Sequence, residues 1–286
     1  MMKKLRSLWE LYRLEHGFMY AVGVVIGIVI STGLDIEVEK VIFGVFTAIF
    51  LQAAAFALND YCDYEVDLKN NRVDRPLVRG DLSKNTALLS FAMLTPIGFT
   101  SAYMIGFEAF LLAFLITIAG FFYDVKLKEF GIAGNIYIGF TMAAPFLFGN
   151  VVATGTVELA VAVLASMAFL SGIAREIMKG IEDIEGDSLR NVRTVARLRG
   201  VDIAGKYSGV VFIISVLLSP IPFFAIHEFF FDFKYIIPVL VTDMILLRLS
   251  LRLLRGHFTR ESISKFRKQT LIAMSIGLVG FLAGAF

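Results

Sequence analysis

The sequence predicts an all-α integral membrane protein, a multi-pass bundle of nine transmembrane helices formed by a single domain over residues 1–286. Three observations predict this class: hydrophobic residues make up 57% of the chain, charged residues make up only 18%, and uncharged apolar stretches recur along the whole length. Soluble domains are usually about 45–50% apolar and about 25% charged, so a water-soluble globule is not expected. The low charge also excludes a disordered chain.

The cysteine count and the net charge exclude some kinds of site and partner. One cysteine cannot build a disulfide framework or a cysteine-based metal site. The net charge of +2 gives no indication of nucleic acid, and we expect no nucleic-acid partner. The expected environment is the lipid bilayer, and no obligatory protein partner is evident.

Each apolar stretch is close to the length that a membrane-spanning helix needs. About 20 residues, at about 1.5 Å each, cross a hydrocarbon core of about 30 Å. Backbone groups in lipid find no water to bond, so these stretches must be helices. In chain order, we expect spans at residues 17–34, 41–58, 86–106, 107–123, 131–153, 157–174, 207–230, 234–254 and 270–286.

The segments between the apolar stretches set the boundaries. The first span follows Lys3, Lys4 and Arg6 but has no small-residue cleavage site, so it is not a removed signal peptide. The third and fourth spans meet at Gly106 with almost no loop. Long charged loops follow the second and sixth spans, and short loops join most of the others.

The charges predict the orientation. With nine spans, alternate loops lie on opposite sides, and one side carries all but two of the 27 Lys and Arg residues. Only Lys40 and Lys234 lie on the other side. Cytoplasmic loops are enriched in Lys and Arg, so the N-terminus is expected inside a cell membrane and the C-terminus outside.

The loop after the second span contains a regular row of acidic and amide side chains. Asn59, Asp63 and Asp67 are spaced i, i+4 and i+8, so a helix continuing from the membrane places them on one face. Like charges at this spacing repel, and a positive group is expected between them. Carboxylate and amide oxygens suit Mg²⁺, which commonly bridges to substrate phosphates. Arg72 and Arg75 follow, and guanidinium groups match phosphate oxygens.

A second acidic segment follows the sixth span, at residues 175–187. Asp183 and Asp187 are again four residues apart, and Lys179 precedes them. A single Asp-x-x-x-Asp has little specificity, and acidic residues beside a membrane usually form a solvated loop. Two such segments on one face, each continuous with a span and mixed with Lys and Arg, favour Mg²⁺ ions holding one diphosphate. The ions would neutralise charge on a leaving diphosphate.

The short loop between the fourth and fifth spans adds candidate diphosphate contacts. It contains Tyr123, Lys126 and Lys128. Interfacial tyrosines and cytoplasmic lysines are ordinary topology features, but this loop lies on the same side as the two acidic segments. Diphosphate contact is therefore an open alternative here.

These segments together resemble the UbiA family of intramembrane prenyltransferases. The family's first signature motif resembles Asn59-Asp60-x-x-Asp63-x-x-x-Asp67 with Arg72 and Arg75-Pro76-Leu77. Its second signature motif resembles the segment from Lys179 to Asp187. The family's pattern for the short loop resembles Tyr123 to Lys128 followed by Gly134-Asn135. The resemblance covers essentially the whole chain. Two departures stand out: Gly180 replaces an Asp of many members, and His16 stands where an Asn is common.

The resemblance implies a fold, a reaction and a set of site residues. The bundle would enclose a cavity open to lipid and capped by helical cytoplasmic loops. A prenyl group would pass from an allylic diphosphate to a lipophilic acceptor with Mg²⁺. The residues implied for metal binding and catalysis are Asn59, Asp63, Asp67, Asp183 and Asp187; those for the diphosphate are Arg72, Lys128, Lys179, Tyr123 and Lys126; those for the acceptor are Arg13 and His16.

The identity of the acceptor is implied only by a closer resemblance to one branch of the family. The sequence of residues 175–187 is most similar to the archaeal lipid branch, which implies geranylgeranyl transfer to geranylgeranylglyceryl phosphate. An aromatic acceptor, of the quinone, haem or chlorophyll type, is the alternative within the family. A multi-pass transporter is the alternative from another class, although transporter sites tend to lie near the bilayer midplane. A CDP-alcohol phosphotransferase would carry an Asp-Gly-x-x-Ala-Arg motif, which is missing here.

Overall fold

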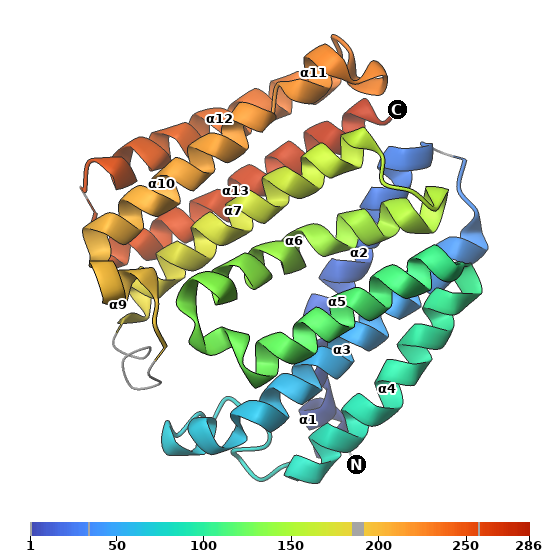
Figure 1. Ribbon diagram of the computed structural model, residues 1–286, viewed down its shortest axis with the longest axis vertical. Coiled ribbons are helices and arrows are strands. Elements are labelled where there is room, and N and C mark those ends of the chain that lie inside the picture. Colours follow the sequence, from blue (N-terminus) through green and yellow to red (C-terminus); the bar gives the residue numbers. More distant parts are fainter. Residues whose placement is uncertain (1, 34, 185–191, 257) are drawn as a thin grey trace. The chain divides into compact units, whose positions relative to one another are not determined.

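The computed structural model describes residues 2–33, 35–184, 192–256 and 258–286, and every regular element in these ranges is a helix, as predicted (Figure 1). The longer helices are α1 (Met2–Tyr12), α2 (Leu14–Thr32), α3 (Val38–Lys69), α4 (Lys84–Ile105), α5 (Phe107–Val125), α6 (Gly131–Thr154), α7 (Leu159–Glu182), α10 (Val201–Leu218), α12 (Phe233–Leu254) and α13 (Arg260–Gly284). Short helical turns are η1 (Leu127–Glu129), α9 (Val195–Arg199), α11 (Ile221–Ala225) and η2 (His227–Phe229).

Seven helical segments of the described chain are long and apolar enough to cross a membrane, and they coincide with the first seven predicted spans. Helices α12 and α13 occupy the places of the last two. Asp243 and Arg248 lie inside α12, and α13 begins with a charged segment, residues 260–268. The predicted total of nine spans therefore stays a prediction, while the multi-pass helical membrane fold is confirmed.

Helix α3 is longer than the span predicted within it. Its 32 residues extend over about 48 Å, which exceeds a hydrocarbon core of about 30 Å by several turns. The excess includes the first acidic segment, because the helix continues without a break to Lys69. The expectation that this segment is a helical extension of the second span is confirmed.

The chain forms two compact units. Unit 1 contains Met1–Ile28, Ile36–Lys126 and Phe148–Thr156, and unit 2 contains Val29–Asp35, Leu127–Leu147 and Val157–Phe286. The single domain over residues 1–286 stays a prediction.

Unit 1 is built around α3, which packs against α1, α4 and α5. One apolar cluster joins Val24 of α2 and Ala102 of α4 to Phe148 and Val152 of α6. A second cluster gathers around Leu11 of α1, which is completely buried. Helix α1, which lies before the first predicted span and was not predicted, is thus packed on the end of unit 1 that carries the acidic segment.

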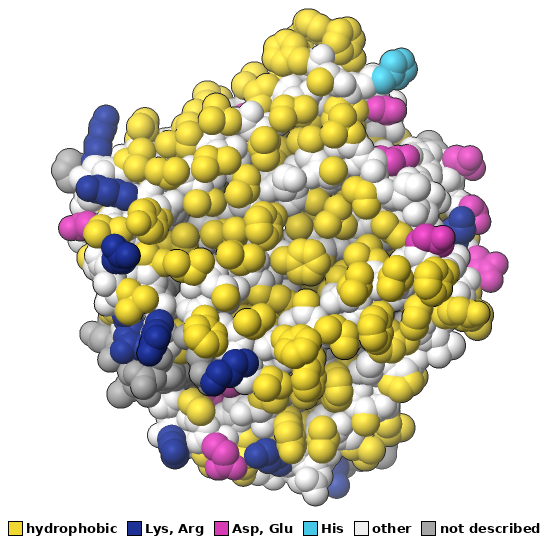
Figure 2. Space-filling view, viewed as in Figure 1, with side chains coloured by type: hydrophobic (Ala, Val, Ile, Leu, Met, Phe, Trp, Pro, Cys, Tyr) yellow, Lys and Arg dark blue, Asp and Glu magenta, His cyan; other side chains and the backbone are white. Residues whose placement is uncertain are grey.

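Unit 2 is a bundle of α7, α10, α12 and α13. Its core includes Met178, Phe212, Leu253 and Ile263, all completely buried. Large hydrophobic side chains remain exposed on the outside of both units, and they make up most of the face drawn in Figure 2. An apolar exterior of this extent is expected where the surrounding solvent is lipid.

Candidate active site

The last three turns of α3 carry the predicted metal-binding residues of unit 1. Asn59 and Asp63 are half-buried, and Asp67 is buried. The helix ends just after them, where the backbone N–H of Asn70 donates to Val66 O. A neighbour that the sequence analysis did not select, Asp60, is also buried.

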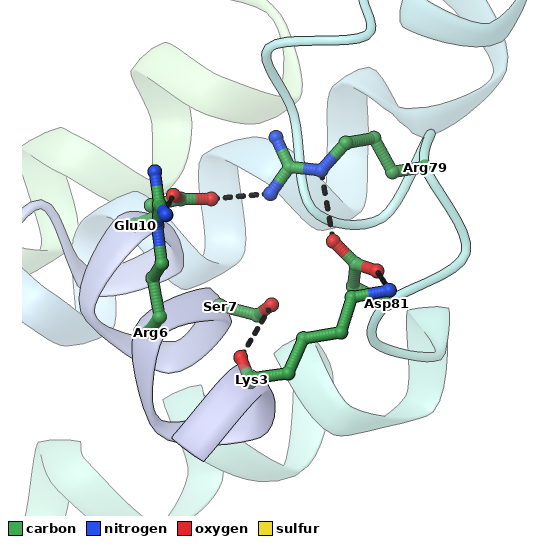
Figure 3. A pocket seen from close by; sticks show the side chains of 6 residues that line it. All are labelled: Lys3, Arg6, Ser7, Glu10, Arg79 and Asp81. Carbon is green, nitrogen blue, oxygen red and sulfur yellow. Dashed lines mark hydrogen bonds and ion pairs between the residues drawn. The ribbon is translucent and has the colours of Figure 1, made fainter.

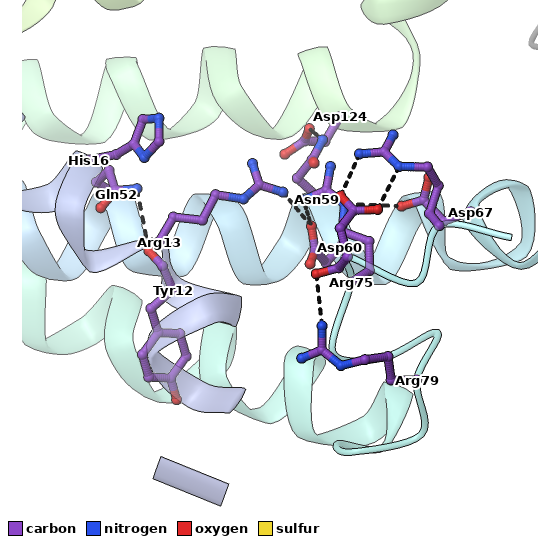
Figure 4. A network of polar contacts seen from close by, with 12 residues as sticks. Tyr12, Arg13, His16, Gln52, Asn59, Asp60, Asp67, Arg75, Arg79 and Asp124 are labelled. Carbon is purple, nitrogen blue, oxygen red and sulfur yellow. Dashed lines mark hydrogen bonds and ion pairs between the residues drawn. The ribbon is translucent and has the colours of Figure 1, made fainter. Parts of the chain in front are cut away.

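The guanidinium groups of two arginines donate hydrogen bonds to the carboxylate of Asp60 (Figure 4). Arg13 Nη2 donates to Asp60 Oδ1 at 2.7 Å, and Arg75 Nη1 donates to the same oxygen at 3.1 Å. The side chain of Asp60 is only 2% exposed, and each arginine side chain is 19% exposed. A carboxylate this deeply buried needs such charged partners, since an unpaired buried charge is very costly.

Arg75 also faces the end of the acidic row. Its Nε lies 3.6 Å from Asp67 Oδ2. Asp60 and Asp67 are seven residues apart, which is two helical turns, so they share a face on which one arginine can reach both. Arg75 is thus a positive group shared by Asp60 and Asp67, while the positive group expected within the row of Asn59, Asp63 and Asp67 stays a prediction.

Arg13 is held in place by its backbone and by an aromatic ring. It separates α1 from α2 with a φ of +44°, a left-handed conformation that is uncommon outside glycine. Gln52 Nε2 donates to Tyr12 O beside this break at 3.4 Å. The Arg13 guanidinium lies 4.1 Å from the centre of the Phe56 ring. The same ring packs in a T-shaped arrangement against His16, with 5.5 Å between the ring centres.

Asn59 is oriented by a residue from α5. Its Nδ2 donates to Asp124 Oδ1 at 2.7 Å, and Asp124 is only 6% exposed. The amide nitrogen is thereby committed to Asp124, which leaves the carbonyl oxygen as the free end of the amide. Asp124 lies between Tyr123 and the exposed Lys126, so this loop contributes a carboxylate besides the predicted tyrosine and lysines.

Arg72 pairs with an acid within its own loop. Its Nε and Nη2 donate to the two oxygens of Asp74 at 2.9 and 2.7 Å. The bond from Arg72 lowers the pKa of Asp74, and the bond to Asp74 raises the pKa of Arg72. Arg72 therefore stays charged, as a diphosphate contact requires.

A separate polar pocket lies where α1 meets the loop after α3 (Figure 3). Its cavity of about 340 Å³ is lined by Lys3, Arg6, Ser7, Glu10, Arg79 and Asp81. Arg79 bonds to Glu10 and, from Nε, to Asp81 Oδ2 at 2.8 Å; Lys3 Nζ lies 2.8 Å from Asp81 Oδ1. These charges are mutually paired, so they tie α1 to the loop.

Unit 2 carries the second acidic segment at the end of α7. Asp183 is the exposed residue that ends the helix, and its N–H donates to Lys179 O. Lys179 Nζ bonds to Glu176 Oε1 at 2.9 Å. Lys128 lies in η1 of the same unit. The predicted Asp187 lies outside the described residues.

The departure at Gly180 has a packing reason. A Cβ atom at this position would lie 3.3 Å from the Cβ of Thr194, whose hydroxyl caps α9. The end of α7 therefore approaches the following segment closely, and the side chain of an aspartate would not fit without displacing Thr194.

The oxygen donors present suit Mg²⁺. Among the described residues, no three Asp, Glu, His or Cys side chains are already grouped as a metal site. The candidate ligands are nevertheless carboxylate and amide oxygens, which Mg²⁺ prefers, and it commonly takes only one or two protein carboxylates beside substrate phosphates. The orientation of Asn59 by Asp124 also leaves the correct amide atom available.

The chain matches a known family over most of its length. The sequence pattern of the UbiA prenyltransferase family matches residues 20–275. The chain belongs to the UbiA prenyltransferase family. The predicted enzyme class, an intramembrane prenyltransferase, is thereby confirmed.

Individual UbiA relatives cover nearly the whole chain. A digeranylgeranylglyceryl phosphate synthase of Archaeoglobus fulgidus is 55% identical over 282 residues, which are 99% of this chain and 96% of the relative. A protein of the same name from Pyrococcus furiosus is 34% identical, over 92% of this chain and 91% of its own.

Solved UbiA structures share the fold. One from work on digeranylgeranylglyceryl phosphate synthase in membranes has a TM-score of 0.87 and 29% identity, covering 99% of this chain and 98% of its own. A UbiA homologue from Archaeoglobus fulgidus bound to DMAPP and Mg²⁺ has a TM-score of 0.70 and 17% identity, over 96% and 99% of the two chains.

Within this UbiA fold, the described residues of the predicted set are divided between the two units. Unit 1 holds Arg13, His16, Asn59, Asp63, Asp67, Arg72, Tyr123 and Lys126, and unit 2 holds Lys128, Lys179 and Asp183. Sequence reasoning missed Asp60 and Asp124 as members of the site. A signal for Asp124 was present, because it is an acid at the end of an apolar helix beside Tyr123; Asp60 was present in the motif but differed in no visible way from its neighbours.

Proposed function

We propose that this UbiA enzyme transfers geranylgeranyl from its diphosphate to the hydroxyl of geranylgeranylglyceryl phosphate, with Mg²⁺ as cofactor. The observation that carries the proposal is the 55% identity, along 99% of the chain, to a digeranylgeranylglyceryl phosphate synthase. The polar end of unit 1 supports it, since carboxylates, an oriented amide and arginines lie together at the end of long apolar helices. A substrate with a charged head and a long apolar tail requires such a boundary.

The proposed cation ligands are the oxygens predicted from the sequence. They are Asn59, Asp63 and Asp67 in α3, Asp183 at the end of α7, and Asp187, which lies outside the described residues. When bound, Mg²⁺ neutralises charge on the departing diphosphate. The oxygens of Asn59 and Asp63 lie on one face of α3, so they can bind on the same side.

The diphosphate would be bound by Arg72, Lys126, Lys128 and Lys179, with Tyr123 as a hydroxyl donor. In the structure Arg72 donates hydrogen bonds to Asp74, and Lys179 donates one to Glu176. These acids orient the two cations, and phosphate oxygens can accept hydrogen bonds from the N–H groups that remain.

The acceptor end is proposed at Arg13 and His16. Both lie against Phe56, one turn before Asp60 on α3. A guanidinium and an imidazole beside an aromatic ring suit an anionic headgroup whose tail enters apolar surroundings. The proposal places this end in the cytoplasmic leaflet, with the N-terminus inside and the C-terminus outside, and requires no protein partner.

The test offers two acceptors in separate reactions. Purified protein in lipid receives radiolabelled geranylgeranyl diphosphate and Mg²⁺ with either geranylgeranylglyceryl phosphate or 4-hydroxybenzoate. Label in a doubly prenylated glycerol lipid is expected. Label on the aromatic acid instead would keep the class of reaction and overturn the acceptor, and label in neither product would overturn the proposed reaction.

A further inference from the structure

The two guanidinium groups that meet at Asp60 neutralise it, and one of them, Arg13, also belongs to the proposed acceptor end. Asp60 Oδ1 accepts from Arg13 at 2.7 Å and from Arg75 at 3.1 Å. The two arginines come from distant parts of the chain, one from the junction of α1 and α2 and the other from the loop after α3. Both converge on one oxygen atom beside the predicted metal-binding row (Figure 4).

The surroundings of Asp60 make it unsuitable as a metal ligand. Its side chain is 2% exposed, and its Oδ1 is fully engaged by the two arginines. Its Oδ2 is buried and, within the described chain, has no hydrogen-bond donor. Asp60 also points about 100° around α3 from Asn59, the adjacent residue in the row. Its contacts are instead those of an anion that fixes cations in place.

The arginines keep hydrogen-bonding capacity for another anion. A guanidinium has five N–H donors, and Asp60 takes one from Arg13 and one from Arg75. Arg75 Nε is buried and, among the described residues, has no acceptor within hydrogen-bond distance, since Asp67 Oδ2 lies 3.6 Å away. A buried donor without an acceptor is rare in proteins and often marks a functional position.

The backbone conformation of Arg13 and several contacts fix its position. Its left-handed backbone, with φ of +44°, costs conformational energy, and the surrounding structure must maintain it. Gln52 holds the neighbouring carbonyl of Tyr12, and the guanidinium lies 4.1 Å from the Phe56 ring. These contacts leave the arginine little freedom and hold its charge beside Asp60.

We propose that Asp60 is a positioning residue, which holds Arg13 and Arg75 as a preorganised pair that binds a phosphate group of a substrate. Two guanidiniums share one carboxylate, so they can be kept close together while retaining free N–H groups. This proposal rests on the proposed function for the identity of the substrates. The phosphate can belong to the prenyl diphosphate or to the glycerol-phosphate acceptor, and the experiment separates these two sources.

The test measures phosphate binding directly, besides turnover. Asp60→Asn keeps the size of the side chain but removes the charge and directs an amide N–H₂ toward a guanidinium. Calorimetry in detergent, with Mg²⁺, measures Kd for inorganic pyrophosphate and, separately, for glycerol phosphate. We expect Kd for one of the two probes to rise about tenfold, as expected for a lost charge-assisted contact. The probe affected identifies the source of the phosphate.

Asp81→Asn is the matched control. Asp81 also holds two cations, Lys3 and Arg79, and it also ties α1 to the loop after α3. Its removal should lower thermal stability without changing either Kd. If Asp60→Asn changes only the melting temperature, as Asp81→Asn does, Asp60 is structural and the proposal is wrong.

A double-mutant cycle tests whether Asp60 acts through the arginines. Arg13→Gln and Arg75→Gln should each raise Kd for the same probe, and adding Asp60→Asn should then change it less than twofold, because coupled residues are not additive. Additive effects would contradict the proposal. These outcomes do not depend on the acceptor assay: failure to prenylate geranylgeranylglyceryl phosphate would overturn the proposed function and leave the binding result intact.

Discussion

Asn59 and Asp124 are 65 residues apart in the chain and are joined by a hydrogen bond of 2.7 Å between Nδ2 and Oδ1. The bond directs the amide nitrogen of Asn59 toward Asp124. Only the carbonyl oxygen of an amide can bind Mg²⁺, so Asp124 selects the useful orientation. Residues that orient metal ligands in this way commonly affect metal affinity or activity about 10–100-fold.

Asp124→Ala should therefore weaken Mg²⁺ activation without removing a ligand. Since the Asn59 amide can then rotate, we expect the Mg²⁺ concentration for half-maximal rate to rise by about tenfold or more. A Mg²⁺ titration of prenyl transfer measures this, with Asp81→Asn as the control. An unchanged Mg²⁺ requirement in folded Asp124→Ala protein would contradict the orienting role.

Acid should weaken the attachment of α1. The bond from Arg79 lowers the pKa of Glu10, and Lys3 and Arg79 lower the pKa of Asp81. A carboxyl whose folded pKa is depressed stabilises the protein above its unfolded pKa and loses this effect as pH falls through the folded value. The melting temperature of the native protein should exceed that of Arg79→Gln at pH 7, by a few degrees at most because the pairs are superficial. The difference should begin to shrink as the pH falls below about 4 and should vanish below the lowered pKa values of Glu10 and Asp81 in the folded protein; a difference that grew on acidification would refute this assignment.

Gly149 of α6 has no room for a side chain. A Cβ atom there would lie 2.0 Å from Val24 O of α2. Gly149→Ala should destabilise unit 1 by about 1–3 kcal/mol, because backbone must move. Gly44→Ala is the control: its nearest neighbour is a Val24 methyl at 3.3 Å, and the helix gains from alanine. Thermal unfolding in detergent compares them, and equal effects would contradict the packing argument.

Asp243 is expected to be structural. Its Oδ2 accepts from Ser219 Oγ at 2.6 Å, and Ser219 O accepts from Tyr235 at 2.5 Å, which links α12 to the end of α10. Asp243→Asn keeps an acceptor for Ser219, so prenyl transfer should stay within about twofold while stability falls by about 1 kcal/mol. Loss of activity at unchanged melting temperature would show that Asp243 has a direct role.

The membrane fold was predictable because long apolar stretches in lipid can satisfy their backbone hydrogen bonds only as helices. Apolar stretches of the right length must be helices, and all nine predicted stretches coincide with helices in the structure. The i, i+4, i+8 spacing likewise predicted the helical extension that carries Asn59, Asp63 and Asp67. These inferences need only local periodicity.

The partners of the site residues were not predictable in the same way. The positive group predicted from repulsion within the acidic row stays a prediction, and the sequence could not show that Arg13 and Arg75 supply charge at Asp60. Such contacts join residues 47 and 15 positions apart. The link between Asn59 and Asp124 is longer still, and depends on how α3 and α5 pack. Helix α1 was missed because its 11 residues include Lys3, Lys4, Arg6 and Glu10 and so form no long uncharged apolar stretch.

The most direct test of the central claim is the transfer of label from geranylgeranyl diphosphate by Asp63→Ala and native protein, each with Mg²⁺ or with EDTA. Asp63 lies in the row that is proposed to hold the metal and the diphosphate. The account predicts product only for native protein with Mg²⁺, while Asp63→Ala stays folded with a similar melting temperature. Substantial product from Asp63→Ala, or from native protein in EDTA, would contradict a metal–diphosphate site at the end of α3.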